Sequence, residues 1–542
     1  MCDGRPIRSI RIEAASLFAP QDPDVLGIAR AVGDAVHVPT HEEIVRHQLL
    51  FREGDACDPA RLAETARLLR AQTYLREAEV VAVASKDGGV DVVVTTRDEW
   101  SLRVSGRLHG GGGFPVRQAR LAEENVFGRA IRAQLRYDGL HRRPAYDADV
   151  TAHQFLGRYE AQAVVGRSSV GLIGEERLLR PFSSEYDRAA WRESARYRKE
   201  PFSLVAPGLD RVDQPLLTVS GDVGAAVRLG SPGRLFVGGA ALAAGRLVAQ
   251  GAPMAAVAAD DSAAATALQG RFAERRRVRV HLFAGARVLR FHPHVGLDAV
   301  HAYEDAREGI EAGVVVGKSL FGGAGLQRDW FGAAELFAGG EAGAMVVFAR
   351  GKLEGRYLIP SRQWDGVLAD GRFFVYSEQG PRASIAFSAG LAGGWNVRTP
   401  FQLTLAGPDG IRGYGLADLP VGRRVVVQAE QRRFLGTVLG VADVGTAAFV
   451  DVGRGWAGGA PFGIETGVRI AVGGGLRVAV PRGSRRTYRL DLALPVTHVR
   501  GRGLELTVAL NQQFGVFRGE PQDVARSREP LSSSSVFDYP RF

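Results

Sequence analysis

One arginine and two carboxylates are the first candidates for a functional site, because charged side chains in such sequence surroundings need ion-pair or hydrogen-bond partners. Arg412 lies in the segment GPDGIRGYGLADLP between Gly410 and Gly413, which let the backbone turn tightly. Its guanidinium offers a forked set of donors that matches a carboxylate. Asp451, in FVDVGRGW, and Glu430, in VVVQAEQRRF, each fall on the polar side of an alternating stretch. A carboxylate placed there needs a partner wherever water is scarce.

Reaction chemistry has little support in the sequence. It contains no G-x-S-x-G elbow, no phosphate-binding loop ahead of a helix and no Cys/His set with metal-ligand spacing. His292 and His294 flank Pro293 and could supply two metal ligands, but a strand-end loop explains them better. Acidic residues are scattered, so no catalytic pair can be argued. We predict that the protein is not an enzyme, with no catalytic residues, no metal and no cofactor.

Composition narrows the class of protein. The 542 residues carry a formal net charge of +10, but the arginines alternate with apolar residues instead of clustering, so we predict no nucleic-acid partner. No stretch reaches the roughly 18 apolar residues that a membrane-spanning helix needs. The opening MCDGRPIRSI shows no signal peptide, so for an exported chain we expect a mature or truncated start or a misassigned initiator. Cys2 and Cys57 could form one disulfide or remain two thiols.

Residues 5–100 predict a small α+β domain. Thr40, with Glu43 three residues later, predicts a capping box at the start of a helix, and Pro59 after Asp58 marks the start of a second helix. The predicted order is strand, helix, helix, strand, strand, with strands at Ile7–Glu13, Arg76–Ala84 and Gly89–Arg97.

From Trp100 onward, apolar and polar residues alternate in short segments. Ile131, Ala133 and Leu135, for example, share one face of a predicted strand. A soluble sheet would turn its apolar face inward, whereas a membrane barrel turns it toward lipid and keeps a wet interior. So long a run of strands favours a closed membrane barrel, and roughly 26 residues per strand and turn predicts about 16 strands.

Three motifs resemble those of BamA/TamA-type outer-membrane assembly barrels, and they occur in the family's order. They are IRGY (Ile411, Arg412, Gly413, Tyr414), the Glu430 strand VVVQAEQRRF, and FVDVGRGW, which contains Phe449, Asp451 and Gly453. The resemblance implies that IRGY sits on a long loop folded back into the barrel. There Arg412 would pair with Asp451, with Glu430 nearby in the lumen.

The front of the chain resembles a POTRA domain, the periplasmic module of these barrels. The resemblance rests on FREGDACDPARLAETARLLRAQTYLREAEVVA followed by VDVVVTTRDEW, with a Gly54–Asp55 turn and a helix that leads to Leu69 and Tyr74. Only one such unit fits before residue 100. The prediction is therefore a mainly β protein in which one POTRA-like α+β domain (5–100) precedes an antiparallel transmembrane β-barrel (101–515).

The remaining tail, 516–542, is rich in proline and serine. It leaves open whether the last strand ends at Phe514 or at Phe542; we predict Phe514, because Val508, Leu510 and Phe514 keep the alternation.

The resemblance implies an outer-membrane protein with its POTRA-like domain in the periplasm, acting as an assembly or insertion factor. Its partners would be unfolded outer-membrane or secreted polypeptides, outer-membrane lipid or lipopolysaccharide, and periplasmic or lipoprotein partners. An export pore for one dedicated secreted partner and a passive channel are the alternatives, and a soluble all-β binding protein is the remaining one.

Overall fold

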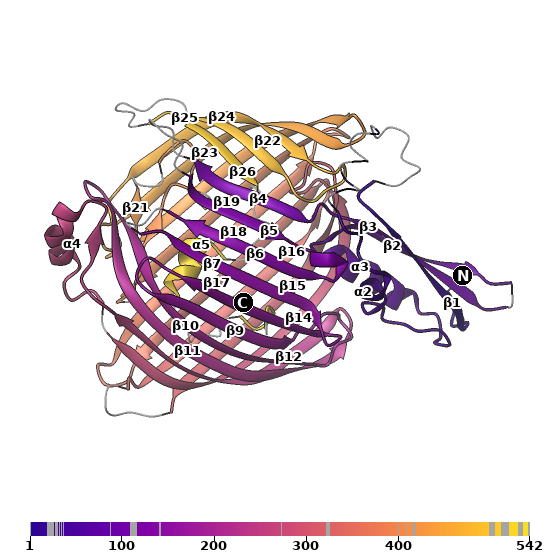
Figure 1. Ribbon diagram of the computed structural model, residues 1–542, viewed down its shortest axis with the longest axis horizontal. Helices are drawn as coiled ribbons and strands as arrows, with labels where there is room; N and C mark the ends of the chain where they lie inside the picture. Colours follow the sequence, from indigo (N-terminus) through magenta and orange to yellow (C-terminus); the bar gives the residue numbers. More distant parts are fainter. Residues whose placement is uncertain are drawn as a thin grey trace.

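The chain is built mainly from β-strands, as predicted, with a small sheet near the N-terminus and one large antiparallel sheet (Figure 1). The computed structural model describes residues 2–18, 37–86, 88–108, 116–139, 143–272, 274–320, 326–398, 400–407, 409–415, 419–497, 505–510, 520–528 and 535–539, and single positions between 19 and 36.

The small sheet belongs to an N-terminal unit whose elements follow the predicted order. They are β1 (Ile7–Ala15), α2 (Glu42–Arg46), α3 (Pro59–Ala71), β2 (Leu75–Ala84) and β3 (Val90–Asp98). The sheet order is β1-β3-β2, with β1 parallel and β2 antiparallel to β3. Helix α3 begins as its sequence predicts: Pro59 occupies the first turn, and the side chain of Asp58 accepts a hydrogen bond from the Ala60 amide at 2.9 Å.

The predicted capping box of Thr40 and Glu43 is wrong. Helix α2 begins at Glu42, and the residue before it, His41, makes no side-chain cap. The hydroxyl of Thr40 instead accepts a hydrogen bond from the side chain of Asn125 at 2.9 Å. Thr40 therefore binds a residue distant in the sequence instead of the start of its own helix, because a short polar side chain can form hydrogen bonds with several different partners.

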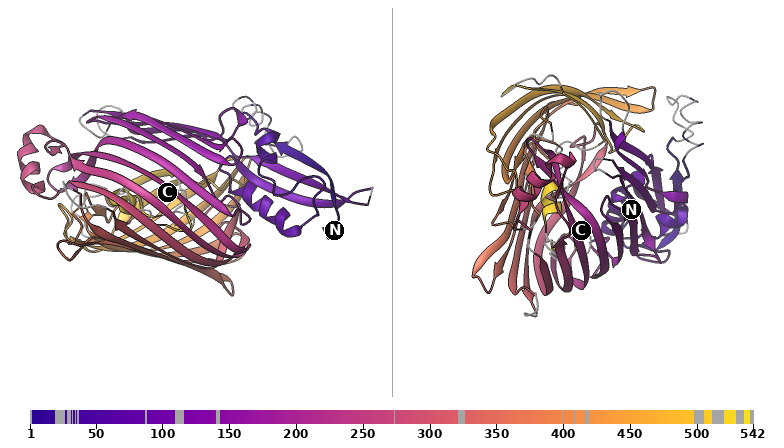
Figure 2. Two further views of the ribbon diagram at one scale, coloured as in Figure 1. Left: turned by 90° about the horizontal axis from the view of Figure 1, so that it is seen from below. Right: turned by 60° about the vertical axis from the view of Figure 1, so that its left-hand side comes forward.

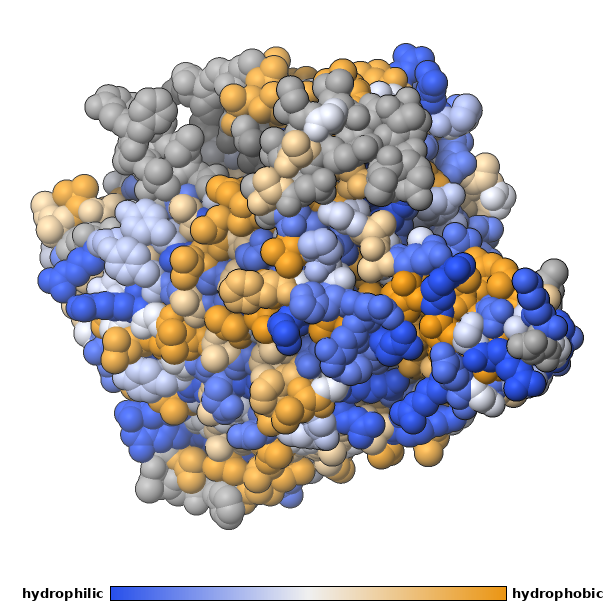
Figure 3. Space-filling view, turned by 45° about the vertical axis from the view of Figure 1, so that its right-hand side comes forward, coloured by the Kyte–Doolittle hydropathy of each residue, from blue (hydrophilic) through white to orange (hydrophobic). Residues whose placement is uncertain are grey.

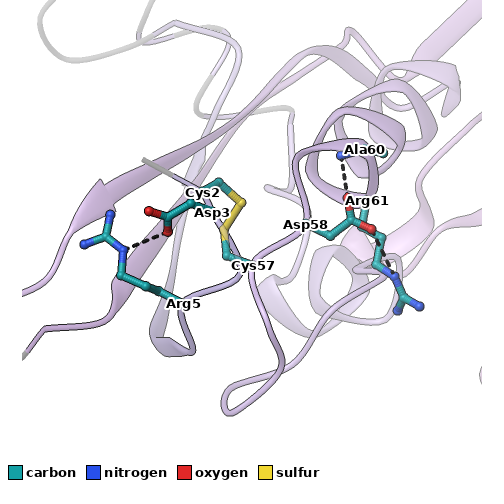
Figure 4. Close-up of a disulfide and its surroundings, with 7 residues drawn as sticks. All are labelled: Cys2, Asp3, Arg5, Cys57, Asp58, Ala60 and Arg61. Carbon is teal, nitrogen blue, oxygen red and sulfur yellow. Dashed lines mark hydrogen bonds and ion pairs between the residues drawn. A yellow bond between two sulfur atoms is a disulfide. The ribbon is translucent and has the colours of Figure 1, made fainter.

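The centre of the N-terminal unit is an ordinary apolar core. Leu69 and Tyr74 lie in it, with side chains from both helices and all three strands. A disulfide joins Cys2 to Cys57 and so ties the start of the chain to the turn before α3 (Figure 4). The sequence had left this pairing open.

The large sheet is a closed barrel in which β9 pairs with β10 and β26 is followed by β4. Its strands are β4 (Leu102–Leu108), β5 (Val116–Glu123), β6 (Ile131–Asp138), β7 (Ala145–Phe155), β8 (Tyr159–Arg167), β9 (Leu172–Arg180), β10 (Ala189–Ala206), β11 (Asp210–Ser231), β12 (Arg234–Ala249), β13 (Met254–Ala255), β14 (Arg275–Val295), β15 (Tyr303–Ser319), β16 (Asp329–Ala342), β17 (Met345–Leu358), β18 (Gln363–Glu378), β19 (Ala383–Trp395), β22 (Arg423–Val438), β23 (Ala442–Trp456), β24 (Gly467–Ala479), β25 (Tyr488–Pro495) and β26 (Glu505–Leu510).

The other elements are short. Strands β20 (Leu403–Thr404) and β21 (Pro420–Val421) form a separate pair, and the helices are η1 (Val126–Gly128), η2 (Ala258–Asp260), α4 (Asp261–Leu268) and α5 (Gln522–Ser527). Among the helices of the described ranges, none is both long enough and apolar enough to cross a membrane.

The predicted strand number is too low. In the described part of the chain the barrel order contains 21 strands, one of which, β13, has only two residues. The prediction of about 16 strands assumed that every strand with its turn takes roughly 26 residues. In fact β4 to β9 place six strands between Leu102 and Arg180, whereas β10 and β11 alone have 18 and 22 residues.

The barrel strands turn apolar side chains outward and charged ones inward. On β14, Leu282 and Val288 are exposed, while Arg277 and Arg279 are almost completely buried on the opposite face. Figure 3 shows many apolar residues, among hydrophilic ones, on the visible outer face of the molecule. This distribution is the reverse of a sheet in a soluble protein, whose apolar face is buried.

The N-terminal unit packs against one end of the barrel. Arg70 of α3 donates two hydrogen bonds to Asp305 of β15, at 2.9 and 2.8 Å. The hydroxyl of Tyr74 accepts a hydrogen bond from the Gln154 side chain at 3.3 Å, and burial raises the pKa of this tyrosine. These contacts fix the unit beside the barrel mouth (Figure 2).

Candidate functional site

The described residues of a long loop between β19 and β22 (396–398, 400–407, 409–415 and 419–422) fold into the barrel and include the IRGY segment. Leu405 and Ile411 are fully buried and pack with side chains of the barrel wall. The amide of Ile411 donates to the carbonyl of Leu405 at 2.9 Å. Gly410 permits this tight turn, since a Cβ there would lie 2.1 Å from the Leu405 carbonyl oxygen. The loop is therefore packed as part of the interior.

Arg412 is bound by carboxylates of two neighbouring strands. Its Nε and one Nη donate to the two oxygens of Asp451 at 2.8 Å each, and its backbone amide donates to the same side chain at 3.0 Å. The other Nη donates to Glu430 at 3.1 Å. The ring of Phe449 lies against the guanidinium, whose Cζ is 3.3 Å from the ring centroid. Such bidentate, charge-assisted contacts fix both position and orientation.

Two more strands complete the ion-pair network. Glu430 also accepts from Arg432 at 3.0 Å and from Arg477 of β24 at 3.3 Å. Asp491 of β25 accepts from Arg412 at 3.4 Å and from Arg477. The side chains of Asp451, Glu430 and Asp491 are at most 2% exposed. Removing any partner would therefore leave a buried charge unsatisfied. We call Arg412, Glu430, Asp451, Arg477 and Asp491 the Arg412 cluster.

Glycines in the wall make room for the side chains of this site. A Cβ at Gly453 would lie 2.9 Å from Cγ2 of Ile411, and a Cβ at Gly473 would lie 2.4 Å from the ring of Phe449. Glycine at these positions lets the loop and the ring approach the sheet closely. Gly453 thus leaves space in the barrel wall for the loop.

Tyr414 anchors the outgoing side of the loop. Its hydroxyl lies 2.9 Å from the carbonyls of Ile470 and Thr497, at β24 and just after β25. Gly413 adopts φ +79°, a conformation that favours glycine, and a Cβ there would lie 3.3 Å from the Cβ of Ala493. The four residues of IRGY are therefore held from both sides.

The structure brings together Ile411, Arg412, Gly413, Tyr414, Glu430, Phe449, Asp451 and Gly453. Phe514, predicted as the end of the last strand, lies outside the described residues. Sequence reasoning missed Arg477 and Asp491. Asp491 could have been found, because it interrupts YRLDLALP on the polar face just as Asp451 interrupts its own strand.

The cluster is suited to holding the loop and not to bond-breaking chemistry. Arg412 cannot act as a proton donor in practice, because arginine stays charged in proteins. The carboxylates around it are engaged in ion pairs and are shielded from water. What this arrangement can do is to fasten one loop to the strands β22 to β25.

A group of potential metal ligands lies on strands β14 to β16. Within the described residues, His292, Glu308 and Glu341 have ligand atoms within 4.8 Å of one another. Nδ1 of His292 is 3.6 Å from Glu308, and Nε2 of His294 is 3.6 Å from Glu341. Partly exposed ion pairs of this kind at strand ends account for the group without a metal.

Comparison with known proteins was made on sequence and on structure. No protein-family model and no curated protein matches the sequence. A crystal structure of BamA from Haemophilus ducreyi lacking POTRA domains 1–3 matches with a TM-score of 0.38 and 12% identity, over 94% of this chain and 85% of that one. CdiB from Escherichia coli matches with a TM-score of 0.44 and 14% identity, over 93% and 75% of the two chains.

CdiB from Acinetobacter baumannii is similar at a TM-score of 0.40 and 10% identity, over 93% of this chain and 73% of that one. OccK5 (OpdH) from Pseudomonas aeruginosa also matches, with a TM-score of 0.30 and 9% identity, over 75% of this chain and 93% of that one.

Proposed function

We propose that the chain is an outer-membrane β-barrel that inserts or translocates other polypeptides without enzymatic activity. The observation that carries the proposal is the Arg412 cluster, in which carboxylates of the barrel wall bind an inward-folded loop. The motifs IRGY, VVVQAEQRRF and FVDVGRGW resemble those of BamA/TamA-type assembly barrels in sequence and order.

The location in a membrane is supported by the inverted faces of the barrel. Outward side chains such as Leu282, Ile310 and Leu336 are more than half exposed, which is unfavourable in water and favourable in lipid. Inward charges such as Arg279 and Asp329 bind each other inside the barrel. Residues 101–515 would thus span the outer membrane, in contact with lipid or lipopolysaccharide.

The N-terminal unit would be a POTRA-like domain in the periplasm, over residues 5–100. Its disulfide fits an oxidising compartment. Strand β2 is an outer strand of the three-stranded sheet, and Val81 and Val83 on it are exposed. Such an edge could add a strand of an unfolded client by backbone pairing. Lipoproteins or other periplasmic proteins are further possible partners of this unit.

A second candidate is export of one dedicated secreted protein. The observation in its favour is the inner wall, on which charged side chains such as Arg192, Glu311 and Asp370 would keep a passing chain hydrated. A passive channel would share this wall, but it would affect no client protein. The two candidates therefore differ in which proteins disappear when this one is depleted.

Insertion into liposomes tests the proposal. Purified wild type and Asp451→Ala would be reconstituted with unfolded barrel clients, and client folding would be followed by protease resistance. Asp443→Ala is the matched control, because Asp443 is a buried carboxylate of the same strand that binds Thr437 instead of Arg412. We expect insertion by wild type and the control and a strong loss in Asp451→Ala.

Equal insertion by all three proteins would contradict a role for the cluster, and no insertion by wild type would contradict the insertion function. Depletion in cells, followed by an inventory of outer-membrane and secreted proteins, separates the candidates. Loss of several barrels indicates insertion, and loss of one secreted protein indicates export.

A further inference from the structure

Part of the chain after the last strand lies inside the barrel. Helix α5 appears within the barrel in Figure 1 and in the right-hand view of Figure 2. The described residues 520–528 and 535–539, called here the C-terminal segment, contact the inner wall and the inward loop. Nothing in the proposed function requires such a segment, so its contacts need a separate explanation.

The first anchor of the segment is a buried ion pair. Arg424 of β22 donates from both Nη atoms to the two oxygens of Asp523, one of them at 3.0 Å. The amide of Thr404, on the inward loop, donates to the same carboxylate at 3.2 Å. Arg424 and Asp523 are both buried, so either one alone would be an unpaired charge in the lumen.

The segment is also fastened directly to the loop that carries IRGY. The amide of Gln522 donates to Asp409 at 3.0 Å, and Arg526 donates to the carbonyl of Gln402 at 3.3 Å. Val524 lies in the same apolar cluster as Ile411. A displacement of α5 would therefore remove support from the loop next to the Arg412 cluster.

The second anchor is a seat in the wall that glycines leave open. A Cβ at Gly285 would lie 2.8 Å from the ring of Phe537, and one at Gly313 would lie 3.0 Å from Val536. The ring of Tyr539 packs on Phe283 at 4.8 Å between centroids. These side chains fit a depression in β14 and β15 that ordinary residues would fill.

Backbone contacts complete this seat. The amides of Val536 and Phe537 both donate to Glu335 of β16, at 2.6 and 3.2 Å. The guanidinium of Arg192 on β10 lies 5.0 Å from the Tyr539 ring. A carboxylate that binds two successive amides recognises a defined backbone conformation and not merely an apolar chain.

The two anchors lie on well-separated parts of the wall. Going round the barrel from β10, the order passes through β11, β12, β14 to β19 and then β22, so β10 and β22 lie far apart around the ring. Arg424 holds the segment at β22, while Tyr539 contacts β10 and β14. Between the two anchors, Arg528 forms an ion pair with Glu354 of β17 at 3.1 Å, so the described parts of the segment contact the inner wall at strands from β22 to β10. A cavity of about 500 Å³, bordered by Glu520, Arg528 and Phe537, remains beside it.

We propose that the C-terminal segment is an autoinhibitory plug, which must leave its seat before the lumen and the inward loop can accept a polypeptide. This inference rests on the proposed function and adds its regulation. The plug is held by specific contacts at its two anchors and by the ion pair of Arg528 with Glu354, so a client that competes for these contacts would release it without unfolding the barrel.

Ion conductance in planar bilayers tests the plug without any client. We expect Arg424→Gln, and a chain that ends at residue 519, to conduct severalfold more than wild type. Arg423→Gln is the matched control, because Arg423 contacts Trp395 and not the segment. Unchanged conductance in both plug variants, with the barrels folded by heat-modifiable gel mobility, would overturn the proposal.

A reversible cross-link provides the converse test. A Cβ at position 313 would lie 3.1 Å from the Cβ of Val536. This is shorter than the roughly 3.5–4.5 Å of a disulfide, so Gly313→Cys with Val536→Cys should lock the plug after a shift of a few tenths of an ångström. We expect the oxidised variant to neither conduct nor insert clients, and reductant to restore both. Wild type treated with reductant controls for loss of the Cys2–Cys57 bond.

A locked barrel as active as its reduced form would overturn the plug. The variant conducting on reduction, with neither it nor wild type inserting clients, would be a different outcome. It would overturn the insertion function and leave the plug supported.

Discussion

The N-terminal unit and the barrel both contain ion pairs between arginine and a carboxylate, but the pair formed by Arg46 is exposed in the unit and the pair formed by Arg412 is buried in the barrel. In the unit, Arg46 binds Glu42 at 2.7 Å, with the two side chains 47% and 55% exposed. In the barrel, Arg412 binds Asp451 at 2.8 Å, with side chains 7% and 0% exposed. The distances are nearly equal, so the contact itself does not distinguish the two pairs. Desolvation does, because a buried charge that loses its partner cannot turn to water.

The two regions also differ in where their apolar side chains lie. The unit buries Leu69 and Val92 in its core, whereas the barrel exposes Leu282 on its outer face. Period-two alternation thus has one meaning in a sheet that faces water and the opposite meaning in one that faces lipid. Single substitutions made in both regions test this difference.

The largest effect is expected from Asp451→Ala. It leaves Arg412 buried beside Glu430 and Asp491 without its bidentate partner, and breaking a buried pair in this way costs about 3–5 kcal/mol. The loop should become accessible to protease at concentrations that spare wild type. Limited proteolysis and urea unfolding in detergent measure both effects. A loop as protected as in wild type would contradict the holding role of the pair.

A charge on the outer face of the barrel should have the next largest effect. Leu282→Arg would place a guanidinium toward lipid, which destabilises a barrel by up to about 2–4 kcal/mol near the bilayer centre. Val83→Arg, on the exposed edge strand of the N-terminal unit, should change stability by less than about 0.5 kcal/mol. Folding into liposomes at increasing urea compares the two. Equal tolerance of both substitutions would indicate that the outer face of the barrel meets water.

Loss of a helix cap should have a smaller and local effect. Asp58→Ala removes the acceptor for the Ala60 amide at the start of α3, which typically costs about 1 kcal/mol. The N-terminal unit should open more readily, while the barrel keeps its heat-modifiable mobility. Hydrogen exchange, read separately for the two regions, checks this. Increased exchange throughout the barrel strands would show that the two regions unfold as one.

The smallest effect is expected from Glu42→Ala. Its ion pair with Arg46 is solvated, so its loss should change stability by about 0.3–0.5 kcal/mol, and by less at high salt. Urea unfolding at low and high ionic strength measures the difference. A loss as large as that in Asp451→Ala would refute the role assigned to desolvation.

The sequence predicted the features that depend on neighbouring residues. Pro59 after Asp58 placed the start of α3, and alternation placed Leu135 on the outer face and Asp451 on the inner face of their strands. The spacing of Arg412, Glu430 and Asp451 identified the centre of the site. The same local reasoning failed at Thr40, whose hydroxyl binds Asn125 far along the chain. It also underestimated the number of strands, because strand length in the barrel is set by pairing with neighbours.

Local sequence patterns therefore specify which segments are strands, which face of each strand is polar and which residue types need partners. The identity of those partners depends on the tertiary fold. Asp491 and Arg477 join Arg412 because four strands lie side by side in register, and Arg424 meets Asp523 across 99 residues of chain. Cys57 likewise reached Cys2 by folding. Alternation specifies a face but not a distant neighbour, since strand register and loop paths arise from contacts between segments remote in sequence.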